Sequence, residues 1–149
     1  MFWIITAATV LLDQLSKLAV SRSMQLESSV TLIPGLLDLT YIRNDGAAWG
    51  ILSGRQTLLM ISTGIIIVLI MIYAVKKAPE LTRLELAALA LIEGGGIGNL
   101  ISRAAGGAVV DFFNIHIIPI FNVADIGVTV GCVLLIAGLF AADNGKTRI

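Results

Sequence analysis

Hydrophobic residues gather in four long stretches that are separated by more polar segments. The stretches cover residues 2–20, 57–75, 84–101 and 124–142. A helix needs about 20 mainly apolar residues to cross the hydrocarbon core of a bilayer. The pattern therefore predicts an all-α membrane protein in which four transmembrane helices form one polytopic domain over residues 1–149.

The first stretch differs from a cleavable signal peptide. No Lys or Arg precedes its apolar run, and Asp13 and Lys17 lie inside it. A signal peptide has basic residues before its apolar run and none within it. We expect a retained helix.

Composition supports a membrane protein. Hydrophobic residues make up 57% of the chain and charged residues 13%, against about 45–50% and about 25% in soluble domains. The ten basic and ten acidic residues give a net charge of zero, so no basic face is expected for binding nucleic acid. A soluble enzyme and a nucleic-acid module are both poor interpretations.

The segments between the helices predict an orientation and a small β element. Basic residues are densest in the short loop 76–83 and recur in the tail, which places both termini on the cytoplasmic side. Loops 22–56 and 102–123 are then extracytoplasmic. Alternating, β-rich segments at 29–33 and 37–42 flank Pro34-Gly35, and residues 109–113 predict another short strand. We expect a β element on the outer membrane surface.

Ionisable side chains at membrane depth are costly and therefore point to function. Asp13 and Lys17 are four residues apart on one helical face, as are Asn99 and Arg103. The structural alternatives are a neutralised pair that holds helices together and an arginine that snorkels to the headgroups. Glu93 lies in a glycine-rich run, where we expect a neutral acid that forms a hydrogen bond within the bundle.

Asp111 and Asp125 are the strongest candidates for chemistry. The 13 residues between them form one hairpin, so both carboxylates return to the same side of the membrane. Two neighbouring carboxyl groups that share a proton are what an aspartic protease requires. The alternative is that Asp125 caps the last helix while Asp111 is a surface residue. The chain has no metal-ligand spacing, and we expect neither a metal nor a cofactor.

Five segments together resemble bacterial lipoprotein signal peptidase (signal peptidase II), in that family's order and over nearly the whole chain. They are Asp13–Lys17, Arg43–Gly50, Gly95–Ile101 with Arg103, Val109–Phe112 and Phe121–Asp125. The resemblance implies an aspartic endopeptidase of the bacterial cytoplasmic (inner) membrane. Its substrate would be a diacylglyceryl-modified prolipoprotein, cleaved just before the lipidated cysteine.

The resemblance also assigns residues. The catalytic pair falls on Asp111 and Asp125. The supporting residues fall on Asp13, Lys17, Asn44, Gly46, Asn99, Arg103 and Asn122. The β element of the loop 22–56 resembles the family's surface cradle, which would grip the substrate from outside. The expected partners are the substrate and membrane lipids, and we expect a monomer.

Two positions depart from the family pattern. Ser102 stands where the family usually has Asp, and we expect it to orient Arg103 or a loop backbone. Glu93 is an unusual acid within the glycine run. Two alternative functions stay open at this point: a small ion- or proton-translocating protein with Asp13, Lys17 and Glu93 along its path, and a non-catalytic membrane scaffold.

Overall fold

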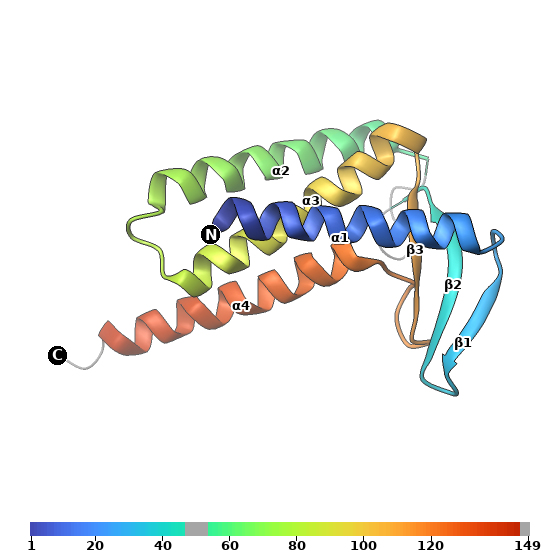
Figure 1. Ribbon diagram of the computed structural model, residues 1–149. Helices are drawn as coiled ribbons and strands as arrows, with labels where there is room; N and C mark the ends of the chain where they lie inside the picture. Colours follow the sequence, from blue (N-terminus) through green and yellow to red (C-terminus); the bar gives the residue numbers. More distant parts are fainter. Residues whose placement is uncertain (47–53, 147–149) are drawn as a thin grey trace.

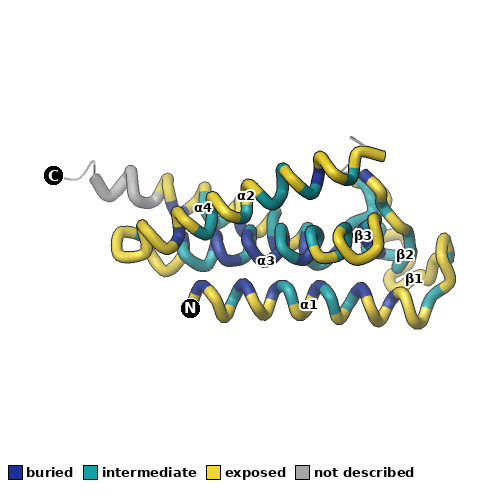
Figure 2. Tube along the Cα trace, turned by 90° about the horizontal axis from the view of Figure 1, so that it is seen from above, coloured by how far each residue is buried: buried dark blue, intermediate teal, exposed yellow. Residues whose placement is uncertain are grey.

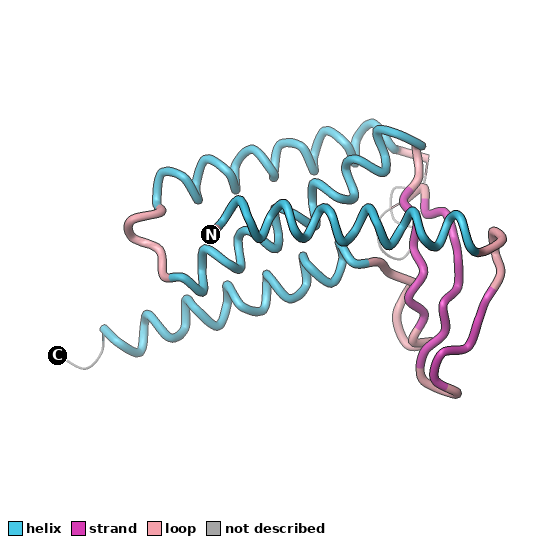
Figure 3. Tube along the Cα trace, viewed as in Figure 1, coloured by secondary structure: helices cyan, strands magenta, loops and turns pink. Residues whose placement is uncertain are grey.

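A computed structural model describes residues 1–46 and 54–146, with side chains described up to residue 140. Four helices run alongside one another, and a small sheet projects sideways at one end of the bundle (Figure 1, Figure 3). The helices are α1 (Phe2–Ser23), α2 (Gln56–Lys77), α3 (Arg83–Gly106) and α4 (Val123–Lys146). Each is long and apolar enough to cross a membrane, which confirms the four predicted helices.

Helix α3 is the centre of the bundle. It packs against α1, α2 and α4, and the burial of its residues is visible along its length in Figure 2. Glycine allows this close packing: a Cβ at Gly95 would collide with the backbone of Ala124 on α4. Helix α2 lies outermost, with Leu59 and Ala74 as its buried residues, which is the pattern of a helix that faces lipid.

The ends of α3 are set by local chemistry. Thr82 and Glu85 form a capping box at the start, and Gly107 ends the helix in a left-handed conformation with φ of 71°. The predicted boundary at residue 101 was too early, because no residue before Gly107 interrupts the helix. Ser102 and Arg103 therefore belong to α3 and not to the following loop.

The sheet joins two segments that are far apart in the chain. Strands β1 (Ser29–Ile33) and β2 (Leu37–Asn44) form the hairpin expected around Pro34-Gly35, and β3 (Val109–Asn114) pairs antiparallel with β2. The strand predictions are confirmed, with β2 two residues longer than expected and β3 one. The register aligns Asn44 with Val109, so the end of β2 lies beside the start of β3 and close to Asp111.

Candidate active site

Asp111 lies on β3 and is buried, with 2% of its surface exposed. Two asparagine side chains donate to its carboxylate: Asn44 Nδ2 to Oδ2 at 2.9 Å, and Asn122 Nδ2 to Oδ1 at 2.6 Å. Asp111 is therefore held from the sheet on one side and from the start of α4 on the other. The alternative that Asp111 is a surface residue is wrong.

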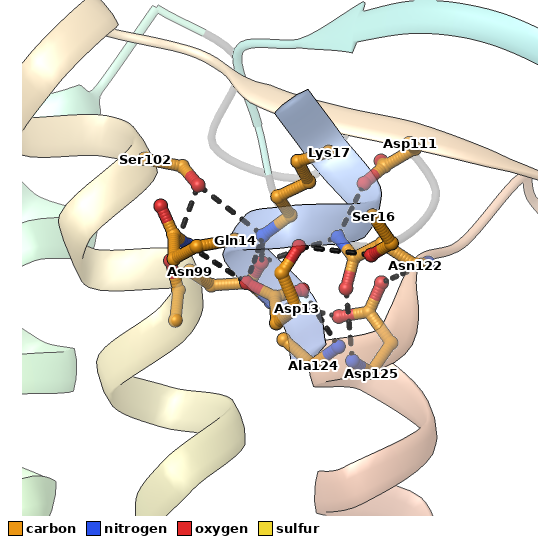
Figure 4. A network of polar contacts seen from close by, with 11 residues as sticks. Asp13, Gln14, Ser16, Lys17, Asn99, Ser102, Asp111, Asn122, Ala124 and Asp125 are labelled. Carbon is orange, nitrogen blue, oxygen red and sulfur yellow. Dashed lines mark hydrogen bonds and ion pairs between the residues drawn. The ribbon is translucent and has the colours of Figure 1, made fainter. Parts of the chain in front are cut away.

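Asp125 lies in the first turn of α4 and takes part in its cap. Its Oδ2 accepts the backbone N–H of Asn122 at 3.1 Å, while Asn122 Oδ1 accepts the backbone N–H of Asp125 at 3.0 Å. The other oxygen, Oδ1, accepts from Asn99 Nδ2 at 2.9 Å. Asn122 thus contacts both aspartates (Figure 4). Asp125 takes part in the cap of the last helix, as the structural alternative predicted, and it also contacts Asn99.

Lys17 and Asp13 connect α1 to this network. Lys17 Nζ donates to Asp13 Oδ2 and to Asn99 Oδ1, both at 2.8 Å. Asp13 is fully buried, and its Oδ1 accepts the backbone N–H of Ala124 at 2.9 Å. The pair therefore joins α1 to α3 through Asn99 and to α4 through Ala124. The helical spacing predicted that the two side chains lie on one face, which is confirmed.

Gly46 and Arg103 meet beside the aspartates through backbone groups. The Gly46 N–H donates to Asn44 Oδ1 at 2.9 Å, and Arg103 Nη2 donates to the Gly46 carbonyl at 3.1 Å. Arg103 thus stabilises the turn that holds Asn44 against Asp111, and it does not simply extend to the membrane surface. The rest of this predicted motif, residues 47–50, lies outside the described residues.

Three findings differ from the sequence interpretation or were missed by it. Ser102 does not contact Arg103: its Oγ accepts from Lys17 Nζ at 3.2 Å and donates to the Gly98 carbonyl at 3.1 Å. Gln14 was overlooked, although its Nε2 bonds both Asp13 and the Gly98 carbonyl. Its position next to Asp13 inside an apolar stretch was the available signal. Glu93 Oε2 is buried and has no hydrogen-bond partner among the described residues.

A cavity of about 560 Å³ opens onto the two aspartates. Asn44, Asn99, Asp111 and Asp125 are among its polar lining residues. Most of the remaining wall is apolar and comes from the segment before α4 and from α4 itself: Ile118, Pro119, Ile120, Phe121, Ile126, Val128 and Val130. Such a site suits a polar reaction on a largely apolar ligand. The described residues contain no group of His, Cys, Asp and Glu suited to a metal ion.

The electrostatics of the site raise the pKa of Asp111. Burial, together with the nearby charge of Asp125, raises its pKa to about 6, whereas the bonds from Asn44 and Asn122 and the charge of Lys17 oppose the rise. A carboxyl group that keeps its proton near pH 6 can donate it, while a neighbouring carboxylate accepts one. A polytopic membrane protein with such a pair on a cavity has the features of a membrane aspartic peptidase.

Comparison with known proteins agrees with that class. Residues 5–141 match the family model described as signal peptidase (SPase) II. The lipoprotein signal peptidase of Listeria welshimeri serovar 6b is 41% identical, over 99% of this chain and 97% of that protein. The lipoprotein signal peptidase of Staphylococcus carnosus is also 41% identical, over 97% of this chain and 92% of that protein. A bacterial membrane enzyme solved at 2.3 Å by the in meso method superimposes with a TM-score of 0.91 at 35% identity, over 99% of this chain and 92% of that chain.

The chain belongs to the lipoprotein signal peptidase (SPase II) family, which confirms the resemblance found in its sequence. It is a multi-pass bacterial membrane enzyme, an aspartic peptidase that removes signal peptides from prolipoproteins. The ion-translocating and scaffold alternatives are therefore set aside. Asp13 and Lys17 pair with one another in the polar network, which is consistent with a supporting role.

Proposed function

We propose that Asp111 and Asp125 are the catalytic pair of this peptidase. The observation that carries the proposal is Asn122, which donates its side-chain amide to Asp111 and its backbone N–H to Asp125 at the polar end of the cavity. One residue thereby holds both carboxyl groups. Both aspartates line the cavity, where a water molecule and a peptide carbonyl would meet them.

The two carboxyl groups have different roles in the proposed reaction. Asp125, beside the positive end of α4, is the base that takes a proton from water as the water oxygen attacks the scissile carbonyl carbon. Asp111, with its pKa raised to about 6, is the acid that protonates the carbonyl oxygen. When the C–N bond breaks, the amine leaves with the proton held on Asp125, and the diol returns a proton to Asp111.

The other site residues position this pair. Asn44 and Asn99 each donate to one carboxylate, and Gly46 holds Asn44 through its backbone. Arg103 in turn donates to the Gly46 carbonyl. Lys17 and Asp13 fix Asn99 and the start of α4. None of these positioning roles requires the side chain to touch the substrate.

We infer a diacylglyceryl-modified prolipoprotein as the substrate, cleaved just before the lipidated cysteine. The apolar wall of the cavity supports this inference, because it adjoins the aspartates and gives an apolar leader and acyl chains a place next to the scissile bond. Since one chain supplies every polar contact described for the site, the enzyme is proposed to act as a monomer.

We also propose that both termini are cytoplasmic and that the aspartates lie near the extracytoplasmic face. Lys76, Lys77 and Arg83 lie around the α2–α3 connection, at the end of the bundle away from the sheet (Figure 1). Short basic loops favour the cytoplasmic side. The sheet and the aspartates are at the opposite end.

Cleavage of a purified, diacylated prolipoprotein by the reconstituted enzyme tests these proposals. We expect Asp111→Asn and Asp125→Asn each to lower the rate at least about a hundredfold, the lower scale for an acid–base residue. Glu80→Gln, which changes an exposed acid near the α2–α3 connection, is the matched control and should cleave normally. Near-normal cleavage by either aspartate variant would contradict the assignment, and equal cleavage of the unlipidated precursor would contradict the substrate.

A further inference from the structure

The segment between β3 and α4 is fastened to the sheet by an ion pair. His116 Nε2 lies 3.1 Å from Asp38 Oδ2 on β2, with 47% of the histidine side chain and 18% of the aspartate side chain exposed. His116 has a positive φ of 64°, and its backbone N–H donates to Asn114 Oδ1 at 3.0 Å. Asn114 Nδ2 in turn contacts Thr40 Oγ1 at 3.2 Å. A sharp turn is thus attached to β2 at two points.

This turn leads directly into one wall of the cavity. Ile118, Pro119 and Ile120 follow His116 and line the cavity next to the aspartates. Ile117 is 80% exposed and Ile118 46% exposed, so packing against the rest of the described chain restrains them little. The attachment of His116 to Asp38 is therefore the side-chain contact with the sheet that lies nearest to this wall along the chain.

A second contact separates the wall from the aspartates. Phe113 and Phe121 exchange two backbone hydrogen bonds, at 2.8 Å and 3.1 Å, at the base of the segment. Asn122, which follows Phe121, is held by its own bonds to Asp111 and Asp125. Residues 115–120 can therefore shift without moving the catalytic groups, so a change here should affect substrate binding and not the chemical step.

We propose that His116, through its ion pair with Asp38, is a positioning residue that holds the wall formed by Ile118–Ile120 in place for binding of the prolipoprotein. The proposal rests on the proposed function, in which this cavity receives the substrate. It predicts that the wall is best ordered, and the substrate best bound, when the contact between His116 and Asp38 is intact.

Uncharged residues lie on both sides of Asp38 in the sheet. Asp38 is the acidic side chain in ion-pair contact with His116 in the described part of the chain. The residues opposite Asp38, Thr31 on β1 and Asn114 on β3, are uncharged. Replacing either partner therefore tests this one contact.

Steady-state cleavage of a diacylated prolipoprotein at pH 6 tests the proposal. His116→Asn removes the imidazole and keeps a residue that tolerates positive φ, and Asp38→Asn removes the partner. Each variant should raise KM about two- to fivefold, the scale of a partly exposed ion pair, with kcat unchanged. The double variant should equal the single ones, because both remove one contact.

A reversed pair provides the rescue. Asp38→Lys combined with His116→Asp restores the attraction with groups that stay charged from pH 6 to pH 8, and aspartate also tolerates positive φ. This double variant should recover the low KM. A wild-type KM in His116→Asn at pH 6, a fall in kcat alone, or additive effects of the two single variants would each overturn the proposal.

Hydrogen exchange gives a measurement that does not depend on activity. At pH 6, the amides of Ile117, Ile118 and Ile120 should exchange faster in His116→Asn than in the wild-type protein, because the attachment is lost. The reversed pair should restore protection. Equal exchange in all three would overturn the proposal. If the wild-type enzyme fails to cleave the substrate, the proposed function falls as well. If it cleaves and the variants keep its KM, only the role of His116 falls.

Discussion

Asp13 on α1 accepts the backbone N–H of Ala124, at the start of α4, over 2.9 Å. The contact fixes the first turn of the helix that carries Asp125 to a different transmembrane helix. The same carboxylate pairs with Lys17 at 2.8 Å, and both side chains are buried, with 0% of Asp13 and 5% of Lys17 exposed. Asp13 therefore joins the position of Asp125 to the packing of the bundle.

Replacement of Asp13 by asparagine should destabilise the fold and lower cleavage. The amide side chain would still present an acceptor to Ala124, but it would leave the charge of Lys17 buried without its counter-charge. Breaking a buried pair in this way costs about 3–5 kcal/mol. Reversible unfolding in detergent micelles would measure the cost, and prolipoprotein cleavage would measure the effect on Asp125.

The exposed pair Lys77–Glu80 is the matched control for that experiment. Its side chains are 48% and 66% exposed, at an N–O distance of 2.8 Å equal to that of the buried pair. Glu80→Gln should cost no more than about 1 kcal/mol. If the two substitutions proved equally mild, the buried pair would not anchor α4.

Local geometry explains which parts of the site could be predicted from sequence. Asp13 and Lys17 share a helical face because a helix turns every 3.6 residues. Asp111 and Asp125 return to one side because a hairpin joins them. Asn44, Gly46 and Asn122 were assigned by resemblance, since no short-range rule brings Asn44 beside Asp111; that approach needs β2 to pair with β3, far along the chain.

The partners that were missed depend on how the helices dock. Ser102 contacts Lys17 and not its neighbour Arg103, because successive residues on a helix point in different directions and the face of Ser102 is turned toward α1. The bond from Ala124 to Asp13 joins a backbone group to a side chain on another helix. Sequence spacing carries no information on either contact.

Gly98 on α3 should not tolerate a side chain. A Cβ at this position would lie 2.5 Å from Asp13 Oδ2 and 3.0 Å from Asp13 Cγ. Gly98→Ala should therefore displace Asp13 and lower stability by about 1–3 kcal/mol. Gly64→Ala on α2 is the control, because its Cβ would have no atom within 4 Å; it should stabilise by up to about 1 kcal/mol. Equal melting temperatures for the two variants would show that α1 and α3 are less closely packed than described.

Asp111 should make the stability of the enzyme fall as the pH rises. Its pKa is raised from 3.8 to about 6, chiefly by burial, so between these values the folded state holds a proton that the unfolded state releases. Stability is then lost as the pH climbs through this interval, by roughly 3 kcal/mol in total. Asp111→Asn has no carboxyl proton at this position and lacks this pH-dependent part of the stability. The free energy of unfolding should therefore fall less in the variant than in the wild-type protein between pH 4.5 and pH 7.5. Equal falls in the two proteins would contradict the raised pKa.

The same group should limit the rate at alkaline pH. Cleavage needs one proton on the aspartate pair, and the form with Asp111 protonated declines above about pH 6. We expect kcat to fall on the alkaline side of the profile. The apparent pKa values of that profile belong to the aspartate pair as a whole. The experiment is a kcat profile of the reconstituted enzyme; a rate that rises steadily up to pH 9 would argue against Asp111 as the acid.

Glu93 should be dispensable for cleavage and unfavourable for stability. It is 1% exposed, and its Oε2 has no hydrogen-bond partner in the described part of the chain. Glu93→Met, which is similar in volume and apolar, removes an unsatisfied polar atom and should stabilise the fold by about 1–3 kcal/mol. Glu93→Gln keeps a polar end and should gain less. Loss of cleavage in Glu93→Met would show that this acid acts in the enzyme.

Ser102 is one of the two positions at which the sequence interpretation expects a departure from the family pattern, and its contacts predict the effect of an aspartate there. Its Oγ accepts from Lys17 Nζ at 3.2 Å, while Lys17 keeps two shorter bonds, to Asp13 and Asn99, both at 2.8 Å. Ser102→Ala therefore removes the weakest of three partners. We expect a loss of about 0.5–1.5 kcal/mol, the scale of one neutral hydrogen bond, and a small reduction in cleavage.

Ser102→Asp should be tolerated or mildly stabilising, because it gives Lys17 a second carboxylate and a charge-assisted bond. The gain should come through Lys17 and not Arg103, whose Nη2 donates to the Gly46 carbonyl. Adding Lys17→Met to Ser102→Asp distinguishes Lys17 from Arg103 as the partner of the new carboxylate. If Lys17 is the partner, the gain in stability should disappear, because the new carboxylate is left buried and unpaired. An unchanged gain would identify Arg103 as the partner. If Ser102→Ala were as inactive as Asp111→Asn at matched membrane levels, Ser102 would take part in the chemistry and a mechanism with two carboxylates would be incomplete.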